Sequence, residues 1–219
     1  HILQTFFGKT EFVSMLTVEF SGKKVPNIAA IWVVQNDYPN YGKTYLLRMP
    51  SRADEELRVI GTSVVPNALT ADEEVSYWTR THEGADTGNI LLYKIGDRVF
   101  YFVPFYTGKE KTVTLQKVAC VMALTGSETE SRKVGFGDDV VTAFRNVYLE
   151  ILASKISGRD IGTYSEAMGI LAGETVRGEN VSEIIAEMNW LLEQRKIALV
   201  NGDEVEAARL LEEFFELFV

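Results

Sequence analysis

Residues 88–106 read GNILLYKIGDRVFYFVPFY, and this stretch carries the clearest hairpin signal in the chain. Two apolar runs flank Gly96-Asp97, a dipeptide that is typical of a tight hairpin turn. Pro104 has no backbone N–H to donate, which favours an end of the second strand at a sheet edge. Successive side chains of a strand point to opposite faces, so the aromatic residues of 100–106 are divided between both faces. The stretch therefore predicts an antiparallel hairpin.

Further strands are expected on both sides of this hairpin. Runs rich in Val, Ile, Phe and Thr, separated by turn-forming residues, predict strands at 11–20, 28–35, 44–49, 57–65 and 113–125. The last run is nearly continuous in apolar residues from Val118, which predicts burial on both faces.

Helices are expected between the strands and at the end of the chain. Thr70 and Glu73 form a capping-box pattern for a helix that precedes the hairpin. Asp138 is the candidate N-cap of a helix through about Ser154, whose apolar residues recur at the 3.6-residue spacing. Asn201-Gly202-Asp203 separates two amphipathic segments, which predicts a helical hairpin.

These elements predict an α+β fold: a mainly antiparallel β-sheet with an inserted helix, followed by C-terminal helices ending in an αα-hairpin. Three parts are expected along the chain. They are a mainly β domain with an inserted helix at 1–155, a Gly-rich linker or weak helix at 156–179, and a C-terminal helical hairpin at 180–219.

The net charge, the length of the apolar runs and the cysteine content limit which partners and locations can be expected. The 219 residues carry 22 Lys and Arg against 31 Asp and Glu, a net charge of −9, which repels phosphate backbones and predicts no nucleic-acid partner. The longest apolar runs fall far short of the roughly 20 residues that span a bilayer, so a membrane segment is expected only outside these residues. His1 in place of Met favours a tag remnant and a native chain that continues upstream. The single cysteine, Cys120, lies in an apolar run and is expected in the core.

Two loops invite ligand interpretations. Gly135-Phe136-Gly137-Asp138-Asp139 resembles a phosphate loop but lacks the third Gly and the Lys, and its carboxylates would repel a phosphate, so helix capping is favoured. In 36–42, Asp37 and Asn40 offer the hard oxygen ligands that Ca²⁺ takes. Only one carboxylate is local and the EF-hand spacing is absent, so a hairpin loop rich in turn formers is favoured over a calcium site.

Tyrosines are the other candidate site residues. Tyr93, Tyr101 and Tyr106 would form an interaction surface for a protein or glycan if one face of the sheet lacks a covering helix, although core packing is the favoured interpretation. His82 lies near the end of the capped helix, where a cation complements the helix dipole. Asn180-Val181-Ser182 matches a glycosylation acceptor pattern.

Three stretches are distinctive when taken together: Phe12-Val13-Ser14-Met15-Leu16, VPNIAAIWVVQNDYPNYGKTYLLRMP at 25–50, and the hairpin at 88–106. They resemble segments of Uncharacterised Protein Family 0182. The segments Leu199-Val200-Asn201-Gly202-Asp203 and Ala207-Ala208-Arg209-Leu210-Leu211-Glu212 are similar to the family's terminal helical pair. The resemblance implies a large multi-pass membrane protein of bacteria or archaea with this domain on the extracytoplasmic side of the cell membrane. It carries over no catalytic residue, because the family has no assigned activity.

The sequence leaves three interpretations of the function open. The resemblance, the acidic composition and the lack of a catalytic motif favour a non-enzymatic interaction or assembly module. Its expected partners are the membrane-spanning part of the same protein, other envelope proteins or a second copy, and no cofactor is expected apart from the calcium alternative. The alternative is a ligand-binding or hydrolytic domain acting on cell-envelope material, which predicts a pocket with converging polar groups. A third interpretation is a cytoplasmic globular protein.

Overall fold

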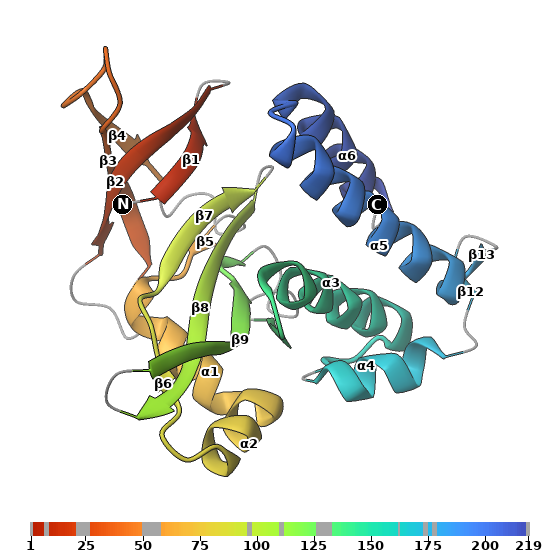
Figure 1. The fold of residues 1–219 in the computed structure, drawn as a ribbon. Helices are drawn as coiled ribbons and strands as arrows, with labels where there is room; N and C mark the ends of the chain where they lie inside the picture. Colours follow the sequence, from red (N-terminus) through yellow and green to blue (C-terminus); the bar gives the residue numbers. More distant parts are fainter. Residues whose placement is uncertain are drawn as a thin grey trace.

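The computed structural model describes residues 2–6, 9–20, 27–49, 58–95, 98–109, 112–125, 133–161, 163–172, 175–176 and 179–217, which form an α+β fold (Figure 1). The strands are β1 (Ile2–Phe6), β2 (Lys9–Glu19), β3 (Ile28–Gln35), β4 (Thr44–Arg48), β5 (Arg58–Val59), β6 (Asp86–Thr87), β7 (Leu91–Ile95), β8 (Arg98–Lys109), β9 (Thr112–Met122), β10 (Leu124–Thr125), β11 (Val134–Gly137), β12 (Thr175–Val176) and β13 (Glu179–Asn180). The helices are the 3₁₀ helix η1 (Thr62–Val64), α1 (Val65–Ala71), α2 (Glu73–Thr81), α3 (Val140–Ser157), α4 (Tyr164–Leu171), α5 (Val181–Val200) and α6 (Glu204–Glu216). The predicted fold class is confirmed.

The central five-stranded sheet is built around the hairpin that the sequence predicted. Its order is β11-β9-β8-β6, and β7 also pairs with β8. The β7–β8 register runs from Leu91 opposite Phe102 to Ile95 opposite Arg98, which confirms the hairpin. The expected turn at 96–97 lies outside the described residues.

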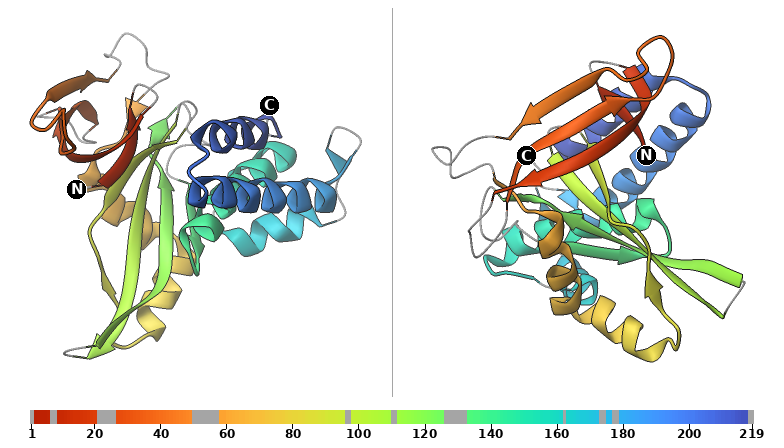
Figure 2. Two further views of the ribbon diagram at one scale, coloured as in Figure 1. Left: turned by 45° about the horizontal axis from the view of Figure 1, so that its top comes forward. Right: turned by 90° about the vertical axis from the view of Figure 1, so that its left-hand side faces the viewer.

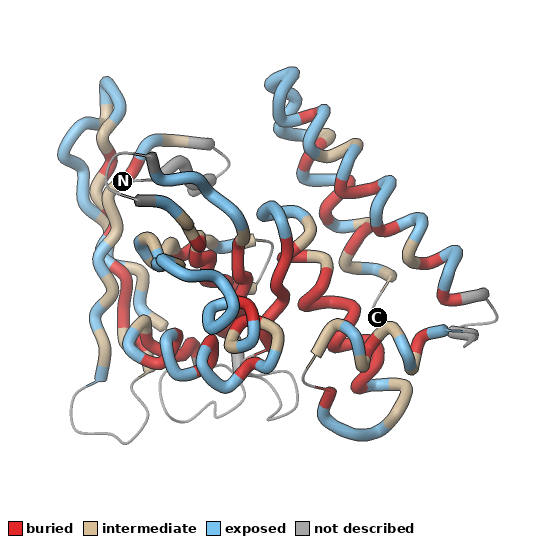
Figure 3. Tube along the Cα trace, turned by 60° about the horizontal axis from the view of Figure 1, so that its bottom comes forward, coloured by how far each residue is buried: buried red, intermediate tan, exposed pale blue. Residues whose placement is uncertain are grey.

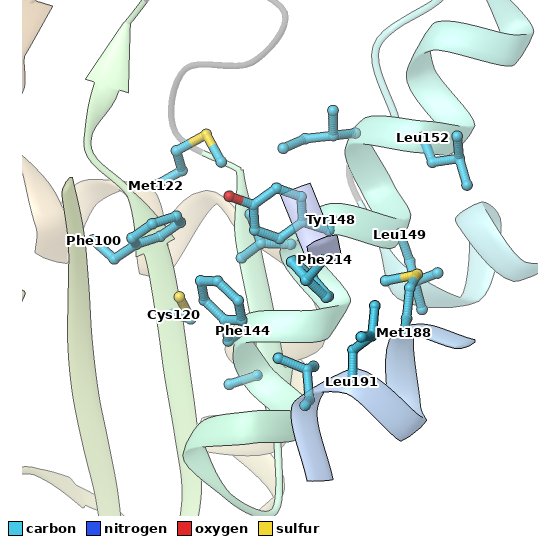
Figure 4. Close-up of a cluster of buried hydrophobic side chains, with 14 of the residues drawn as sticks. Phe100, Cys120, Met122, Phe144, Tyr148, Leu149, Leu152, Met188, Leu191 and Phe214 are labelled. Carbon is cyan, nitrogen blue, oxygen red and sulfur yellow. The ribbon is translucent and has the colours of Figure 1, made fainter. Parts of the chain in front are cut away.

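Alternate residues of β8 and β9 enter two different cores. Phe100 and Phe102 pack with α3–α6 in a helix-side core, which Figure 4 shows around Phe144, Tyr148 and Phe214. Tyr101 and its odd-numbered neighbours pack in a strand-side core with α1, α2 and the second sheet. Residues 118–123 are all buried, which confirms the expected burial of this strand on both faces.

Pro104 does not end its strand, contrary to the prediction. It pairs with Val118 in the interior of β8. Pairing with β7 stops at Phe102 and pairing with β6 resumes at Phe105, so Pro104 lies opposite the gap between these two short strands. Its carbonyl accepts a 2.8 Å hydrogen bond from the Gly88 N–H, and the missing N–H faces the same gap.

A second sheet of four strands, in the order β1-β2-β3-β4, covers part of the strand-side core (Figure 2). Its inner face contributes Val13, Ile31 and Val33 to that core. The predicted strands at 11–20, 28–35 and 44–49 are confirmed.

The predicted strand at 57–65 is wrong beyond Ile60. Residue 61 is a Gly with extended backbone, and the chain then turns through η1 into α1. Pro66 occupies the first turn of α1, where a missing N–H breaks no helical hydrogen bond. A β-rich composition is thus overridden by the helix-start signal of the proline.

Two predicted N-caps are each off by one or two residues. Asp72, not Thr70, caps α2, and its Oδ1 accepts a 2.8 Å bond from the Val75 N–H. The Thr70 hydroxyl instead donates to the Pro66 carbonyl within α1. Asp139, not Asp138, caps α3 by accepting from the Thr142 N–H at 2.8 Å.

Helix α3 packs on β9 and β11 of the central sheet, α4 and α5 pack on α3, and α6 packs on α5. The αα-hairpin of α5 and α6 is confirmed, with Gly202 in the left-handed region at φ 76° and Asp203 as the next N-cap. The segment 156–179 contains α4, and Ile161, Ala167 and Leu171 join the same core. Figure 3 shows in red where the buried residues lie along the described chain. The three-part division of the chain stays a prediction.

None of the helices in the described part of the chain combines the length and apolarity required to cross a bilayer.

Candidate functional site

The outer face of the four-stranded sheet carries large apolar side chains in register. Pairing places Leu16 opposite Trp32 and Trp32 opposite Leu46, so one row of large side chains crosses three strands. Side chains of directly opposed residues lie on the same face of a sheet. We call this row, with Phe12 and Val18 on the same face of β2, the outer apolar face.

These side chains are exposed to an unusual degree for large apolar groups. The exposed fractions are 40% for Phe12, 66% for Leu16, 37% for Val18, 42% for Trp32 and 40% for Leu46. In the right-hand view of Figure 2, no described element lies in front of β2, β3 and β4. Contiguous apolar surface of this kind marks an interaction site more often than single exposed residues do.

A further row of paired residues lies on each side of the central row. Ser14, Val34 and Thr44 are opposed in one flanking row, and Val18, Ala30 and Arg48 in the other. Arg48 is the one charged residue at these nine paired positions. The outer apolar face is therefore almost free of charge on a chain whose net charge is −9.

The tyrosines predicted as an interaction surface lie elsewhere. Tyr101 is fully buried, and its hydroxyl donates a 2.7 Å hydrogen bond to the Ile60 carbonyl. Burial also raises the pKa of the Tyr101 hydroxyl well above its usual value. The prediction of a partner surface at Tyr101 is thus wrong in this fold, because α1 and the second sheet cover that face of β8.

Tyr93 and Tyr106 are half-buried and engaged within the chain. The Tyr93 ring meets Phe102 edge-on at 5.8 Å, and burial raises the pKa of its hydroxyl. A Cβ on Gly88 would lie 2.7 Å from the Tyr106 ring, so that ring packs directly over the glycine backbone. Packing against the chain, the favoured interpretation, accounts for both contacts.

The predicted calcium ligands stabilise the loop that joins β3 and β4. The Asp37 carboxylate accepts a 2.6 Å bond from the Phe12 N–H. Asn40 donates to Glu11 and accepts from the Lys43 ammonium at 2.6 Å, which places a cation beside its oxygen. Among the described residues, no group of three or more His, Cys, Asp or Glu side chains is arranged to hold a metal ion. Calcium binding at Asp37 and Asn40 stays a prediction.

A column of buried polar side chains along α3 forms a second candidate site, which the sequence did not indicate. Asn146, Glu150 and Ser154 are spaced by four residues and are all buried. The Asn146 amide donates to the Phe136 carbonyl at 2.8 Å, and the Ser154 hydroxyl accepts from the Ile161 N–H at 3.1 Å.

Glu150, in the middle of this column, is 2% exposed. Its pKa is raised to about 9, mainly by burial and also by the nearby Asp72, while the Lys133 ammonium opposes the shift. Lys133 is itself buried and donates to the Asp160 carboxylate and the Ile161 carbonyl. Glu150 is therefore a neutral carboxylic acid at pH 7.

Asp72 couples this column to the start of α2. It is 7% exposed, and burial raises its pKa to about 6 although the Val75 N–H bond acts in the opposite direction. The neighbouring Glu74 raises the pKa further, and the Glu74 carboxylate also accepts a 3.1 Å bond from the Ser165 N–H of α4.

An open cleft of about 580 Å³ lies where α2 meets α4, lined by Ala71, Glu73, Thr163, Ser165 and Glu166. Glu166 forms a 2.7 Å ion pair with Arg159. The cleft is polar and acidic, and Asp72 is adjacent in sequence to two of its lining residues. Perturbed carboxyl pKa values beside a cleft are a known feature of functional sites and also of structural networks.

The remaining sequence candidates have structural roles. A Cβ on Gly135 would lie 2.0 Å from the Ala143 carbonyl oxygen, so the glycine permits close contact of β11 with α3, in keeping with the capping interpretation of 135–139. His82 is the C-cap of α2 and stacks on Trp78 with centroids 4.4 Å apart. Cys120 is fully buried, and burial raises the pKa of its thiol. Asn180 lies in β13, directly before α5, and not in the expected loop.

Comparison with known proteins finds three UPF0182 proteins. The chain is 24% identical to that of Saccharopolyspora erythraea over 152 residues, which are 68% of this chain and 15% of that protein. It is 25% identical to that of Alkaliphilus metalliredigens over 135 residues, 60% of this chain and 13% of the relative. It is 29% identical to that of Nostoc sp. over 100 residues, 44% of this chain and 9% of the relative.

No family model matches the chain, and no solved structure matches it. The chain spans less than a sixth of the length of the curated relatives it matches. The three matches confirm the resemblance stated from the sequence and support membership of the UPF0182 family.

Proposed function

We propose, from its similarity to the UPF0182 family, that this chain is a non-enzymatic interaction or assembly module that binds a protein partner through the outer apolar face. The observation that carries the proposal is the row Leu16, Trp32 and Leu46, which is exposed across three paired strands. Burying apolar area contributes about 25 cal/mol per Å², so a partner that covers this row gains a large part of its binding energy there.

The geometry of the face suits protein binding better than small-molecule binding. Small ligands favour concave pockets with a few converging polar groups, and this face is one side of an open sheet. Trp is among the residues most enriched at the energetic centres of protein interfaces, and Trp32 lies in the middle of its row.

Photo-crosslinking tests the proposal. A photoreactive amino acid replaces Leu16 on the outer apolar face or, as the matched control, the exposed Val205 on α6. In the native protein in its host membrane, Leu16 should yield a defined adduct, either with another polypeptide or with the membrane-spanning part of the same protein, and Val205 should not. Absence of any adduct at Leu16, or the same adducts at both positions, would overturn the proposal.

We place the module on the extracytoplasmic side of the cell membrane, with the membrane-spanning part of the same protein as its first partner. The family resemblance supports this location. The only cysteine, Cys120, is buried, so a Cys introduced at Val205 is the one thiol that a reagent can reach in the folded chain. A membrane-impermeant maleimide should label Val205→Cys in intact cells. Labelling that requires lysis would contradict the location.

A ligand-binding or hydrolytic domain acting on cell-envelope material is the second candidate. It is favoured by one observation, the acidic cleft whose lining residues Ala71 and Glu73 flank the buried Asp72. Calorimetric titration with soluble cell-wall glycan and peptide fragments tests it. Binding that Glu166→Gln weakens and Glu212→Gln, on exposed α6, leaves unchanged would support this candidate, and no heat with any fragment would remove it.

A further inference from the structure

We infer that the partner covering the outer apolar face is a second copy of this chain, packed face to face across a two-fold axis. The inference rests on the proposed function and names the occupant of the same surface. Three features of the face support the inference: the arrangement of its large and small side chains, its charge and its area.

The rows of large and small side chains on the face are complementary to the same rows on a second copy. The row of large side chains, Leu16, Trp32 and Leu46, is flanked on one side by a row of smaller ones, Ser14, Val34 and Thr44. Two antiparallel sheets that pack face to face interdigitate their inner side chains at a spacing of about 10 Å. A two-fold related copy displaced by one row places each large row over the smaller row of its partner, and the same contact then occurs twice.

The charge of the face permits a second copy although the chain as a whole is acidic. Each chain has 31 Asp and Glu residues, but none occupies the nine paired positions of the three rows. Facing copies therefore oppose no carboxylates at the contact, and Arg48 lies in the outermost paired position of its row on β4. A strongly charged partner could form ion pairs only with this one cation of the three rows. A copy of the same face instead places uncharged side chains against uncharged side chains.

The area of the face is in the range that a dimer needs. Five large apolar side chains with exposed fractions between 37% and 66% present on the order of 500 Å², near the upper limit of the largest patch on a typical monomer. A standard interface buries roughly 800 Å² on each partner. The five apolar side chains therefore supply more than half of such an interface, and the exposed Thr44 and Arg48 at the rim add to it.

Sedimentation equilibrium of the 219-residue chain over a wide concentration range tests the inference. The wild type should show a reversible monomer–dimer equilibrium. Trp32→Ser should weaken dimerisation at least tenfold. The matched control is Trp190→Ser, which removes a 56% exposed Trp from α5 and should leave the dimer constant unchanged. Circular dichroism of each variant checks that the fold is retained.

Two results would overturn the inference. One is a wild-type chain that stays monomeric at every concentration, and the other is a dimer that Trp32→Ser and Trp190→Ser affect equally. If Leu16 still crosslinks to a different polypeptide in the membrane, the dimer is wrong while the proposed interaction function stands. If neither a dimer nor a Leu16 adduct is found, both are wrong.

Discussion

Glu150 is the residue whose environment departs furthest from what its sequence position indicates. It lies among Val147, Tyr148 and Ile151, and a single apolar stripe on α3 would place it towards solvent. In the fold, α3 is covered on several sides, by β9, β11, α4 and α5, so residues on more than one face of the helix are buried. Periodicity indicates which residues share a face but not how many faces are covered, and Glu150 could not be predicted as buried for that reason.

The pH dependence of stability follows from this burial. The pKa of Glu150 rises from 4.5 to about 9 on folding, and that of Asp72 from 3.8 to about 6. The folded chain therefore retains protons that the unfolded chain releases. The stabilisation of the fold by these two retained protons is complete below about pH 4. It is lost progressively as the pH rises, up to about pH 6 for Asp72 and up to about pH 9 for Glu150. Each group lowers the free energy of unfolding by on the order of 1 kcal/mol per pH unit within its range.

Glu150→Gln should remove the share of this dependence that Glu150 contributes between about pH 4.5 and about pH 9. Gln is close in shape to the protonated acid and cannot ionise, so the variant should be more stable than wild type at pH 8 and similar to it at pH 4. Urea denaturation at a series of pH values measures this, with exposed Glu212→Gln as the control. Parallel pH profiles for wild type and Glu150→Gln would show that the group is not buried as described.

At the scale of helices and strands, the N-caps of α2 and α3 show how accurately a capping residue can be predicted from the sequence. Acidic residues near the start of α2 and α3 were expected, but the caps are Asp72 and Asp139 in place of Thr70 and Asp138. Several candidate caps stand side by side in both segments, and only the backbone conformation selects among them. Asp138 instead pairs with Lys117 at the surface.

The pair Asp138 and Asp139 gives a matched test of this assignment. Asp139→Ala should destabilise the fold by about 1 kcal/mol, because the Thr142 N–H loses its acceptor. Asp138→Ala should change stability by less than about 0.5 kcal/mol, since it removes only an exposed ion pair. Chemical denaturation of both variants decides the assignment, and a larger effect at Asp138 would reverse it.

The contact between β11 and α3 depends on a missing side chain. A Cβ on Gly135 would lie 2.0 Å from the Ala143 carbonyl oxygen and 2.6 Å from the Val147 amide nitrogen, so backbone must move to admit it. Gly135→Ala should destabilise the protein by about 3 kcal/mol or more. Gly169→Ala, within α4 and with nothing near its Cβ, should instead stabilise it by about 0.5–1 kcal/mol. Thermal unfolding measures both, and equal effects of the two substitutions would contradict the close approach.

The hairpin at 88–106 was predictable because its signals are local. Alternation and the Gly-Asp turn signal fix the pairing of β7 with β8 without knowledge of the rest of the chain. Pro104 could not be placed correctly, because its position depends on where β6 and β7 leave a gap opposite β8. That gap is a property of the assembled sheet.

At the scale of the whole molecule, the two cores on opposite faces of the central sheet organise the fold. Sequence alternation indicated side chains on both faces, but it could not show that α3–α6 cover one face and the second sheet covers the other. The uncovered surface is therefore on β2–β4 and not on the tyrosines of β8. Which sheet face remains exposed is decided by packing between segments far apart in sequence.

The helical hairpin should unfold together with the central sheet. Phe214 of α6 is fully buried and meets Tyr148 at 5.1 Å in the same core as Phe100 of β8. Phe214→Ala should lower the free energy of unfolding by about 3–5 kcal/mol while unfolding remains a single transition. Circular dichroism and tryptophan fluorescence should give coincident curves. A separate early transition of the helices would show that the hairpin is an independent unit.

Concentration-dependent hydroxyl-radical footprinting tests most directly whether the outer apolar face is an interaction surface between copies of this chain. The wild-type protein contains its own controls for Trp32 on the outer apolar face. Trp190 on α5 is the exposed control, and Trp78 is the buried one. Oxidation of Trp32 should fall as protein concentration rises, while Trp190 stays reactive and Trp78 stays protected. Equal and constant oxidation of Trp32 and Trp190 at every concentration would contradict the account.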